Sequence, residues 1–208
     1  MSMRRDALRN RQRLLEAADA MFREHGVDVG VGEIAAAAGV GRGTLFRNFA
    51  SKDELIAAVL AERIGEVLAT GREMLENDPD DAGVAFAFVE ELVARQDENR
   101  ALLQTLTEET FTMPDLQRTQ AAMLELLEAL LDRGKAVGAI RPEATASDLM
   151  MLIKGLCMHP ATDQPLPPET VLRHLDLVRA ALSTPEFSQP LRGVPAAAPR
   201  RAPALQTR

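Results

Sequence analysis

The fold is decided by residues 31–49, which read VGEIAAAAGVGRGTLFRNF. The pattern predicts two short helices joined by a tight turn at Gly39, because a residue without a Cβ enters the left-handed conformation most cheaply. In the second helix, Leu45 and Phe49 lie four residues apart and therefore share one face. The other face carries polar and basic side chains, namely Arg42, Thr44, Arg47 and Asn48. A helix this short needs the support of a partner helix.

A short helix that is polar and basic on its open side suits insertion into a DNA major groove, as in a helix-turn-helix. The same pair also fits a generic helical hairpin with no role in DNA binding, so the flanking residues decide between the two interpretations. Residues 7–25 predict a long helix with one apolar face, which ends at Gly26. Ser51 and Glu54 predict a capping box that opens the next helix, over residues 53–77.

With these helices and turns in this order along the chain, residues 11–60 resemble the DNA-binding head of TetR-family transcriptional regulators. The resemblance is carried by residues 17–18, Phe22, Gly26, 33–35, 38–40, 43–49 and 51–55. It implies an all-α, cytoplasmic homodimer that binds a palindromic operator in double-stranded DNA, acting as a ligand-responsive repressor. Each subunit would have a three-helix head and a larger helical domain that dimerises and binds a small effector.

The resemblance also implies which residues contact DNA: Arg42, Gly43, Thr44, Phe46, Arg47, Asn48 and Lys52. Arginine offers two parallel donors to guanine, and Lys52 is a point charge for a phosphate at a helix N-terminus. The sequence departs from the family pattern at Gly32, Gly41, Phe46 and Asn48. Phe46 stands where the family commonly has tyrosine, so it lacks the hydroxyl for a phosphate and fits packing or a thymine methyl instead.

The net charge of −7 is unusual for a DNA-binding protein, but it is unevenly distributed. Residues 1–55 hold nine Lys and Arg against eight Asp and Glu, so the acidity belongs to the rest of the chain. Five arginines crowd the N-terminus: Arg4, Arg5, Arg9, Arg11 and Arg13. This asymmetry favours a basic arm that contacts nucleic acid, although a solvated tail would have the same composition.

The chain divides into three predicted parts. Residues 1–52 form the helix-turn-helix head with its basic arm, and 53–185 form the helical effector-binding and dimerisation domain. Residues 186–208, rich in Pro, Ala and Arg, are expected to be a disordered tail.

Behind the head, helices are expected over residues 82–97, 99–111, 115–135 and 149–158, with a last one from Pro167. The helix over 149–158 is apolar nearly all round, so every face should be buried. A dimer interface of four helices, two from each chain, would bury it, and so would the centre of a monomer core. Two heads are needed to read two half-sites, which favours the dimer.

Methionine and phenylalanine side chains suggest an adaptable apolar pocket for a bulky, mostly apolar effector. The candidate ligand-binding residues are Phe86, Phe111, Met123, Met151, Met158 and His159. The same residues at helical spacing also fit an ordinary hydrophobic core.

No pattern in the chain indicates catalysis, a metal site or a cofactor. The single cysteine, Cys157, lies near His159, but no second cysteine or histidine pair completes a metal site. No run of apolar residues is long enough for a membrane helix. An enzyme is therefore not expected. The remaining alternative is a helical interaction or ligand-binding module without specific DNA binding.

Overall fold

The computed structural model describes residues 2–77, 82–95, 112–157, 167–188 and 192, with the side chains of residues 2–4 and 157 left out. Its α-helices are α1 (Ser2–His25), α2 (Val31–Ala37), α3 (Arg42–Asn48), α4 (Lys52–Asn77), α5 (Val84–Ala94), α8 (Pro114–Ala136), α9 (Ala146–Cys157) and α10 (Pro168–Leu182). A short 3-10 turn, Pro185–Phe187, follows. Within these residues the only β-type pairing is one bridge between Ile140 and Ser183, so the all-α prediction is confirmed.

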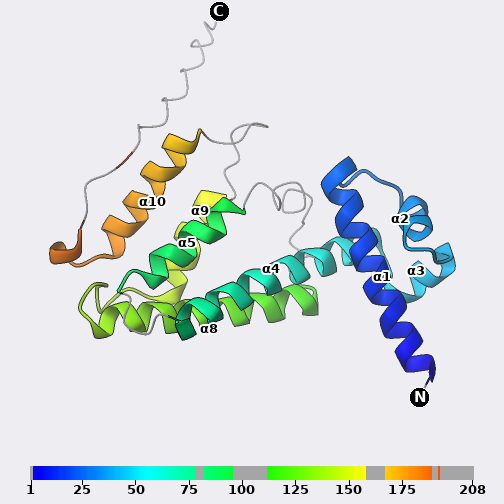
Figure 1. Cartoon of the computed structure of the whole chain (residues 1–208), viewed down its shortest axis with the longest axis horizontal. Helices are drawn as coiled ribbons and strands as arrows, with labels where there is room; N and C mark the ends of the chain where they lie inside the picture. Colours follow the sequence, from blue (N-terminus) through cyan, green and yellow to red (C-terminus); the bar gives the residue numbers. More distant parts are fainter. Residues whose placement is uncertain (1, 78–81, 96–111, 158–166, 189–191, 193–208) are drawn as a thin grey trace, which may run out of the picture.

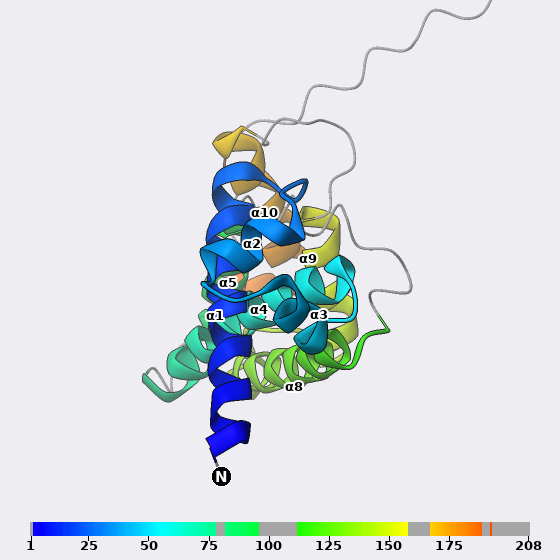
Figure 2. The same cartoon turned by 90° about the vertical axis from the view of Figure 1, so that its right-hand side faces the viewer.

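Helices α1, α2 and α3 form a head at one end of the molecule, and α5, α8, α9 and α10 lie behind it (Figure 1). Helix α4 leaves the head and runs beside α8 into the rear part, as both views show (Figures 1 and 2). Helix α1 begins five residues before the predicted 7–25, whereas α5 is shorter than the predicted 82–97. The predicted helix over 99–111 lies outside the described residues.

The turn between α2 and α3 has the predicted left-handed glycine. Gly39 has φ +64°, and its N–H donates to the Ala36 carbonyl at 3.0 Å. The next residue, Val40, donates to the Ala35 carbonyl, also at 3.0 Å. These two bonds close the end of α2 in the Schellman pattern. A Cβ at position 39 would also lie 2.5 Å from Nη2 of Arg13, so the turn packs directly against α1.

The start of α4 has half of the predicted capping box. The Glu54 N–H donates to Ser51 Oγ at 3.0 Å, as expected. However, Glu54 Oε2 accepts from the N–H of Ala50 at 2.6 Å and not from that of Ser51. The carboxylate therefore reaches one residue further back, but it still closes the loop before the helix.

Two apolar cores share α4. Its first turns supply Leu55, Ile56 and Val59 to the head core, together with side chains of α1 to α3. Further along, Val67 and Leu68 belong to the core of the rear part. One continuous helix, α4, therefore contributes to both the head core and the core of the rear part.

A buried ion pair joins α1 to α4 between the two cores. Arg63 on α4 has only 6% of its side chain exposed, and its Nε lies 2.6 Å from Asp19 Oδ1 on α1. Asp19 also accepts a hydrogen bond from Arg23 Nε at 2.9 Å. Charge-assisted hydrogen bonds compensate for burying these charges, and they fix the crossing of α1 over α4.

The rear core is built from α4, α5, α8, α9 and α10. Helix α9 was expected to be buried on every face, but in the single chain it is not. Leu149 and Ile153 are buried, whereas Met151 is 69% exposed. The exposed side of α9 is therefore available for a contact outside the chain.

Two glycines of α4 provide a matched test of this packing. A Cβ at Gly71 would lie 2.6 Å from side-chain atoms of Leu126 and Phe88, whereas one at Gly65 would meet nothing within 4 Å. We expect Gly71→Ala to lower the free energy of unfolding by about 1–3 kcal/mol through overpacking. Gly65→Ala should raise it by up to about 1 kcal/mol, since alanine favours helix. Urea unfolding of both variants measures this, and equal effects would contradict the close approach of α4 to α5 and α8.

Candidate nucleic-acid interface

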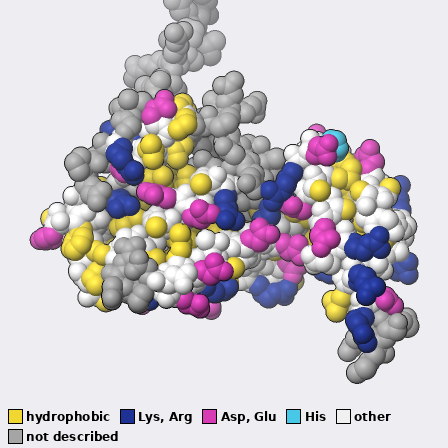
Figure 3. Space-filling view, viewed as in Figure 1, with side chains coloured by type: hydrophobic (Ala, Val, Ile, Leu, Met, Phe, Trp, Pro, Cys, Tyr) yellow, Lys and Arg dark blue, Asp and Glu magenta, His cyan; other side chains and the backbone are white. Residues whose placement is uncertain are grey.

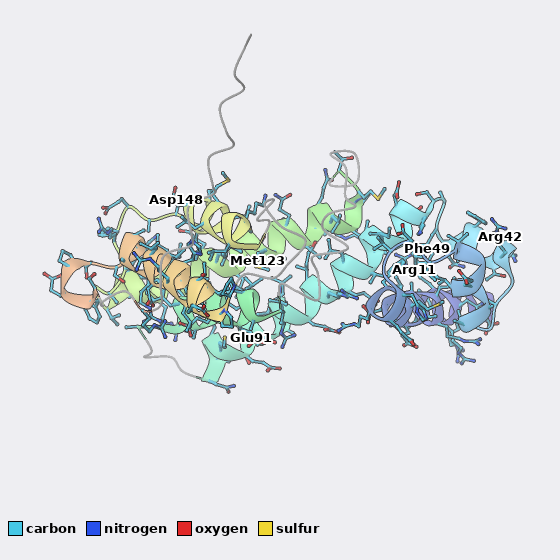
Figure 4. The ribbon with its side chains drawn as sticks, turned by 90° about the horizontal axis from the view of Figure 1, so that it is seen from above. Arg11, Arg42, Phe49, Glu91, Met123 and Asp148 are labelled. Atoms are coloured by element: carbon cyan, nitrogen blue, oxygen red, sulfur yellow. The ribbon has the colours of Figure 1, made fainter. Side chains whose placement is uncertain are left out.

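Helix α3 buries one side and exposes the other. Leu45 and Phe49 are both fully buried, as the four-residue spacing predicts. Arg42, Gly43, Phe46 and Arg47 are exposed, and Thr44 and Asn48 are partly exposed. In Figure 4, Arg42 lies at the outer end of the head, whereas Phe49 lies on its inner side. The structure thus brings all six predicted α3 residues to one accessible surface, which we call the α3 face.

Hydrogen bonds within α3 order part of this face. Arg47 Nε donates to the Gly43 carbonyl at 3.1 Å, and Arg47 Nη2 donates to Thr44 Oγ1 at 3.0 Å. Asn48 Nδ2 donates to the Thr44 carbonyl at 2.8 Å. The side-chain oxygen and the second amide N–H of Asn48, together with the remaining N–H groups of Arg47, are left for a ligand.

Arg42 and Phe46 form a pair at the start of the helix. The Arg42 guanidinium lies 5.7 Å from the centroid of the Phe46 ring, within the range of a cation–π contact. Phe46 remains 44% exposed, so it packs beneath the arginine and not into the core. Among the described residues the Arg42 guanidinium makes no hydrogen bond or ion pair. It therefore has all its donors free for a base or a phosphate.

Lys52 is the first residue of α4, and its side chain is half-buried. It follows Ser51, whose hydroxyl caps the helix. An ammonium group here lies beside helix amide groups that favour an anion. This position suits a phosphate contact next to the α3 face.

The N-terminal arginines belong to α1, which is helical from Ser2. Figure 3 shows Lys and Arg side chains gathered along the outer side of the head, whereas Asp and Glu are more frequent over the middle of the molecule. Arg11 is directed inward instead. Its guanidinium lies 4.5 Å from the Phe49 ring centroid, and its Nη2 lies 3.1 Å from Asp115 Oδ2 at the start of α8.

The contact between Arg11 and Asp115 was not predicted. It joins residues 104 positions apart, and neither residue lies in a local pattern that marks the other. Asp115 also pairs with Arg118, one turn along α8. The head is therefore tied to α8 as well as to α4.

A cleft of about 700 Å³ opens at this junction, between α1, α4 and α8. Its walls include Leu15, Ala58, Ala61 and Glu62. Desolvation is the main reason why the pKa of the Glu62 carboxyl is raised above its usual value; the Arg11 guanidinium acts in the opposite direction, and the nearby carboxylates of Asp19, Glu16 and Glu66 add smaller raising contributions.

The predicted ligand-binding residues are not all brought together. Phe86 and Met123 are buried in the core of the rear part, 6% and 7% exposed. Met151 is on the exposed side of α9 and does not join them. Phe111, Met158 and His159 lie outside the described residues.

Two kinds of feature are absent from the described part of the chain. It contains no cluster of three His, Cys, Asp or Glu side chains placed to hold a metal ion. No helix in it combines the length and apolar character needed to cross a membrane.

Two family models match the sequence. Residues 14–59 match the bacterial regulatory proteins of the tetR family, and residues 78–200 match the C-terminal domain of SbtR-like transcriptional regulators. An HTH-type transcriptional regulator of Staphylococcus aureus is 30% identical over 105 residues, which are 50% of this chain and 57% of the relative. The match thus spans just over half the length of that relative.

Solved structures share the fold over most of the chain. The crystal structure of a TetR transcription regulatory protein from Mycobacterium vanbaalenii has a TM-score of 0.59 and 26% identity, covering 88% of this chain and 99% of that one. A TetR transcriptional regulator from Streptomyces coelicolor has a TM-score of 0.61 and 26% identity, covering 84% and 99%. The likeness therefore includes both the head and the helices behind it.

The raised pKa of Glu62 predicts a pH-dependent effect on stability. The folded-state pKa of Glu62 lies above the unfolded value of 4.5. At a pH between these two values the folded chain binds more protons than the unfolded chain, so the free energy of unfolding falls as the pH rises through this interval. Glu62→Gln should therefore raise the free energy of unfolding at pH 7, and the gain should shrink as the pH approaches 4.5. Denaturant unfolding at several pH values measures it. Glu73→Gln, on the same helix but outside the wall of the cleft, is the control; an equal, pH-independent gain in both variants would contradict the prediction.

Proposed function

Because the chain belongs to the tetR family of bacterial regulatory proteins, we propose that it is a DNA-binding transcriptional regulator of the bacterial cytoplasm. The observation that carries the proposal is the α3 face. Leu45 and Phe49 anchor the helix in the head core, and the opposite surface offers Arg42 and Arg47 to a major groove.

The residues of this face have different roles in the proposal. Arg42, with its free donors, reads a base edge and uses Phe46 as a stacking surface. Arg47 and Asn48 are held by Gly43 and Thr44, so they contact DNA with the groups that those bonds leave available. Lys52 binds a phosphate and sets the position of the head without reading sequence.

The protein acts as a homodimer in this proposal, since two heads are needed for half-sites about 34–36 Å apart on a palindromic operator. Two features support an interface formed by α9 and α10. Met151 on α9 and Leu177 on α10 are 69% and 44% exposed, and hydrophobic side chains are visible over α10 in Figure 3. An open groove of about 530 Å³ lined by Met151 and Ala181 runs along the same two helices.

We further propose that residues 53–185 bind a small, mostly apolar effector and that the protein is a repressor. Side chains around Phe86 and Met123 are the candidates for contact, and Phe111, Met158 and His159 remain candidates from the sequence. An effector that binds better to a second arrangement of α4 would alter the head separation. Its effect is limited by its differential affinity for the two arrangements, typically about 1–3 kcal/mol.

The proposed roles of Arg42 and Lys52 predict different outcomes on an operator selected from random DNA by the purified protein. Arg42→Ala should cost about 1–3 kcal/mol and relax the preference at one base position. Lys52→Ala should weaken binding to all DNA sequences alike and should lower the slope of log affinity against log salt concentration by about 1. Fluorescence anisotropy titrations at several salt concentrations measure both effects.

Arg72→Ala removes the same charge from an exposed position of α4 outside the head and should leave both quantities unchanged. If the wild-type protein selects no sequence and shows no salt-dependent binding, the DNA-binding proposal is wrong. The helical interaction module would then be the better interpretation.

The proposed interface predicts the effect of charges on oligomeric state. The double variant Met151→Glu with Leu177→Glu should shift the protein from dimer to monomer, because it buries two carboxylates without partners. Its operator affinity should fall with it. Val137→Glu alters another exposed apolar residue, at the end of α8, and should leave the dimer intact. Sedimentation equilibrium measures the oligomeric state of each variant, and a double variant that remains dimeric would rule out this interface.

A further inference from the structure

Phe46 is the one large apolar side chain of α3 that the head core does not use. It is 44% exposed, whereas Leu45 and Phe49 on either side of it in the sequence are fully buried. A single exposed apolar residue is common on protein surfaces, so the role of Phe46 depends on the groups around it.

Arg42 covers part of the Phe46 ring. The two residues are four positions apart on the helix, and the guanidinium carbon lies 5.7 Å from the ring centroid. The ring limits the positions that the arginine side chain can take but accepts none of its N–H groups in the plane of the guanidinium. Within the described residues Arg42 has no hydrogen bond or ion pair, so these in-plane donors remain for an acceptor.

The surface beside this pair is open at Gly43. This residue lies three positions before Phe46 and has no side chain, and even a Cβ at this position would meet nothing within 4 Å. A flat group can therefore approach the exposed part of the Phe46 ring from this side without displacing a side chain.

The major groove of DNA offers partners for both side chains at neighbouring positions. Guanine presents the acceptors N7 and O6, which match two parallel donors of an arginine, and thymine presents an apolar C5 methyl group. Successive bases of one strand lie about 3.4 Å apart along the helix axis. The 5.7 Å between the Arg42 guanidinium and the Phe46 ring is less than two such steps, so the pair can reach adjacent bases.

We propose that Arg42 and Phe46 act together to read a guanine that is adjacent to a thymine. Arg42 donates to N7 and O6 of the guanine, and the exposed part of the Phe46 ring covers the thymine methyl group. The inference rests on the proposed operator binding and names two adjacent bases of the operator. It also gives a function to a ring without a hydroxyl, which cannot donate a hydrogen bond to a phosphate.

The test uses the full-length protein and the operator that it selects from random DNA. Each half-site should contain a thymine next to the guanine whose identity no longer matters to Arg42→Ala. Deoxyuridine in place of this thymine in one half-site removes only the methyl group. Fluorescence anisotropy should show about fourfold weaker binding by the wild-type protein, which is the contribution of burying one methyl group.

Phe46→Ala should bind the thymine and deoxyuridine operators with equal affinity, because it lacks the ring that covers the methyl group. Its free energy of unfolding in urea should stay close to that of the wild type, since the ring lies outside the head core. Deoxyuridine at a thymine that flanks the half-sites is the matched control on the DNA and should change the affinity of neither protein.

Three results would overturn the proposal: a selected half-site with no thymine beside a guanine read by Arg42, equal binding of both operators by the wild type, or a loss on deoxyuridine that persists in Phe46→Ala. The third result would assign the methyl contact to another side chain. Failure to select any operator would instead contradict the proposed function, and this inference with it, so the two kinds of failure are distinguishable.

Discussion

The whole arrangement depends on one helix serving two hydrophobic cores. A head of about 50 residues buries too little apolar surface to be stable by itself. Leu55, Ile56 and Val59 complete its core from α4, and the same helix continues into the rear core through Val67 and Leu68. The head is therefore stable only in the orientation that α4 gives it. The ion pair between Asp19 and Arg63 fixes that orientation at the point where one core ends and the other begins.

Arg11 extends this dependence to α3. Its side chain contacts the Phe49 ring, directly after α3, and its guanidinium bonds Asp115 at the start of α8. A movement of α8 relative to α1 must therefore change one of these contacts. The proposed response to an effector needs such a connection, because a ligand in the rear part can act on DNA only by favouring one head position over another.

Short-range patterns predicted the local structure well. The glycine turn at Gly39 and the inward direction of Leu45 and Phe49 both follow from rules that involve fewer than ten residues. The all-α class also followed, because the periodicity of each long helix is strong. The prediction of the capping box was only half confirmed, since a side chain as long as that of Glu54 can reach either of two adjacent N–H groups.

Contacts between distant residues could not be predicted in this way. The pairs Arg11 with Asp115 and Arg192 with Asp176 join charged residues that are common on any helix surface, so nothing in the sequence distinguishes them. The expected tail, 186–208, lies mostly outside the described residues, yet Arg192 within it bonds the buried Asp176 and keeps the pKa of that carboxyl below its usual value. Met151, predicted for the pocket, is 69% exposed in the single chain, and composition does not distinguish a pocket methionine from an interface methionine, because methionine suits both.

The position of Arg63 also determines where a head could be exchanged between relatives by recombination. On α4 the apolar contacts of the head end at Val59, and Arg63 follows one turn later. A crossover between these two residues would keep every apolar contact of the head but leave Asp19 facing a foreign side chain. A joint after Arg63 would also keep the pair of Asp19 with Arg63, so the exchangeable unit is longer than the DNA-binding head itself, and only the pair of Arg11 with Asp115 would depend on the incoming α8.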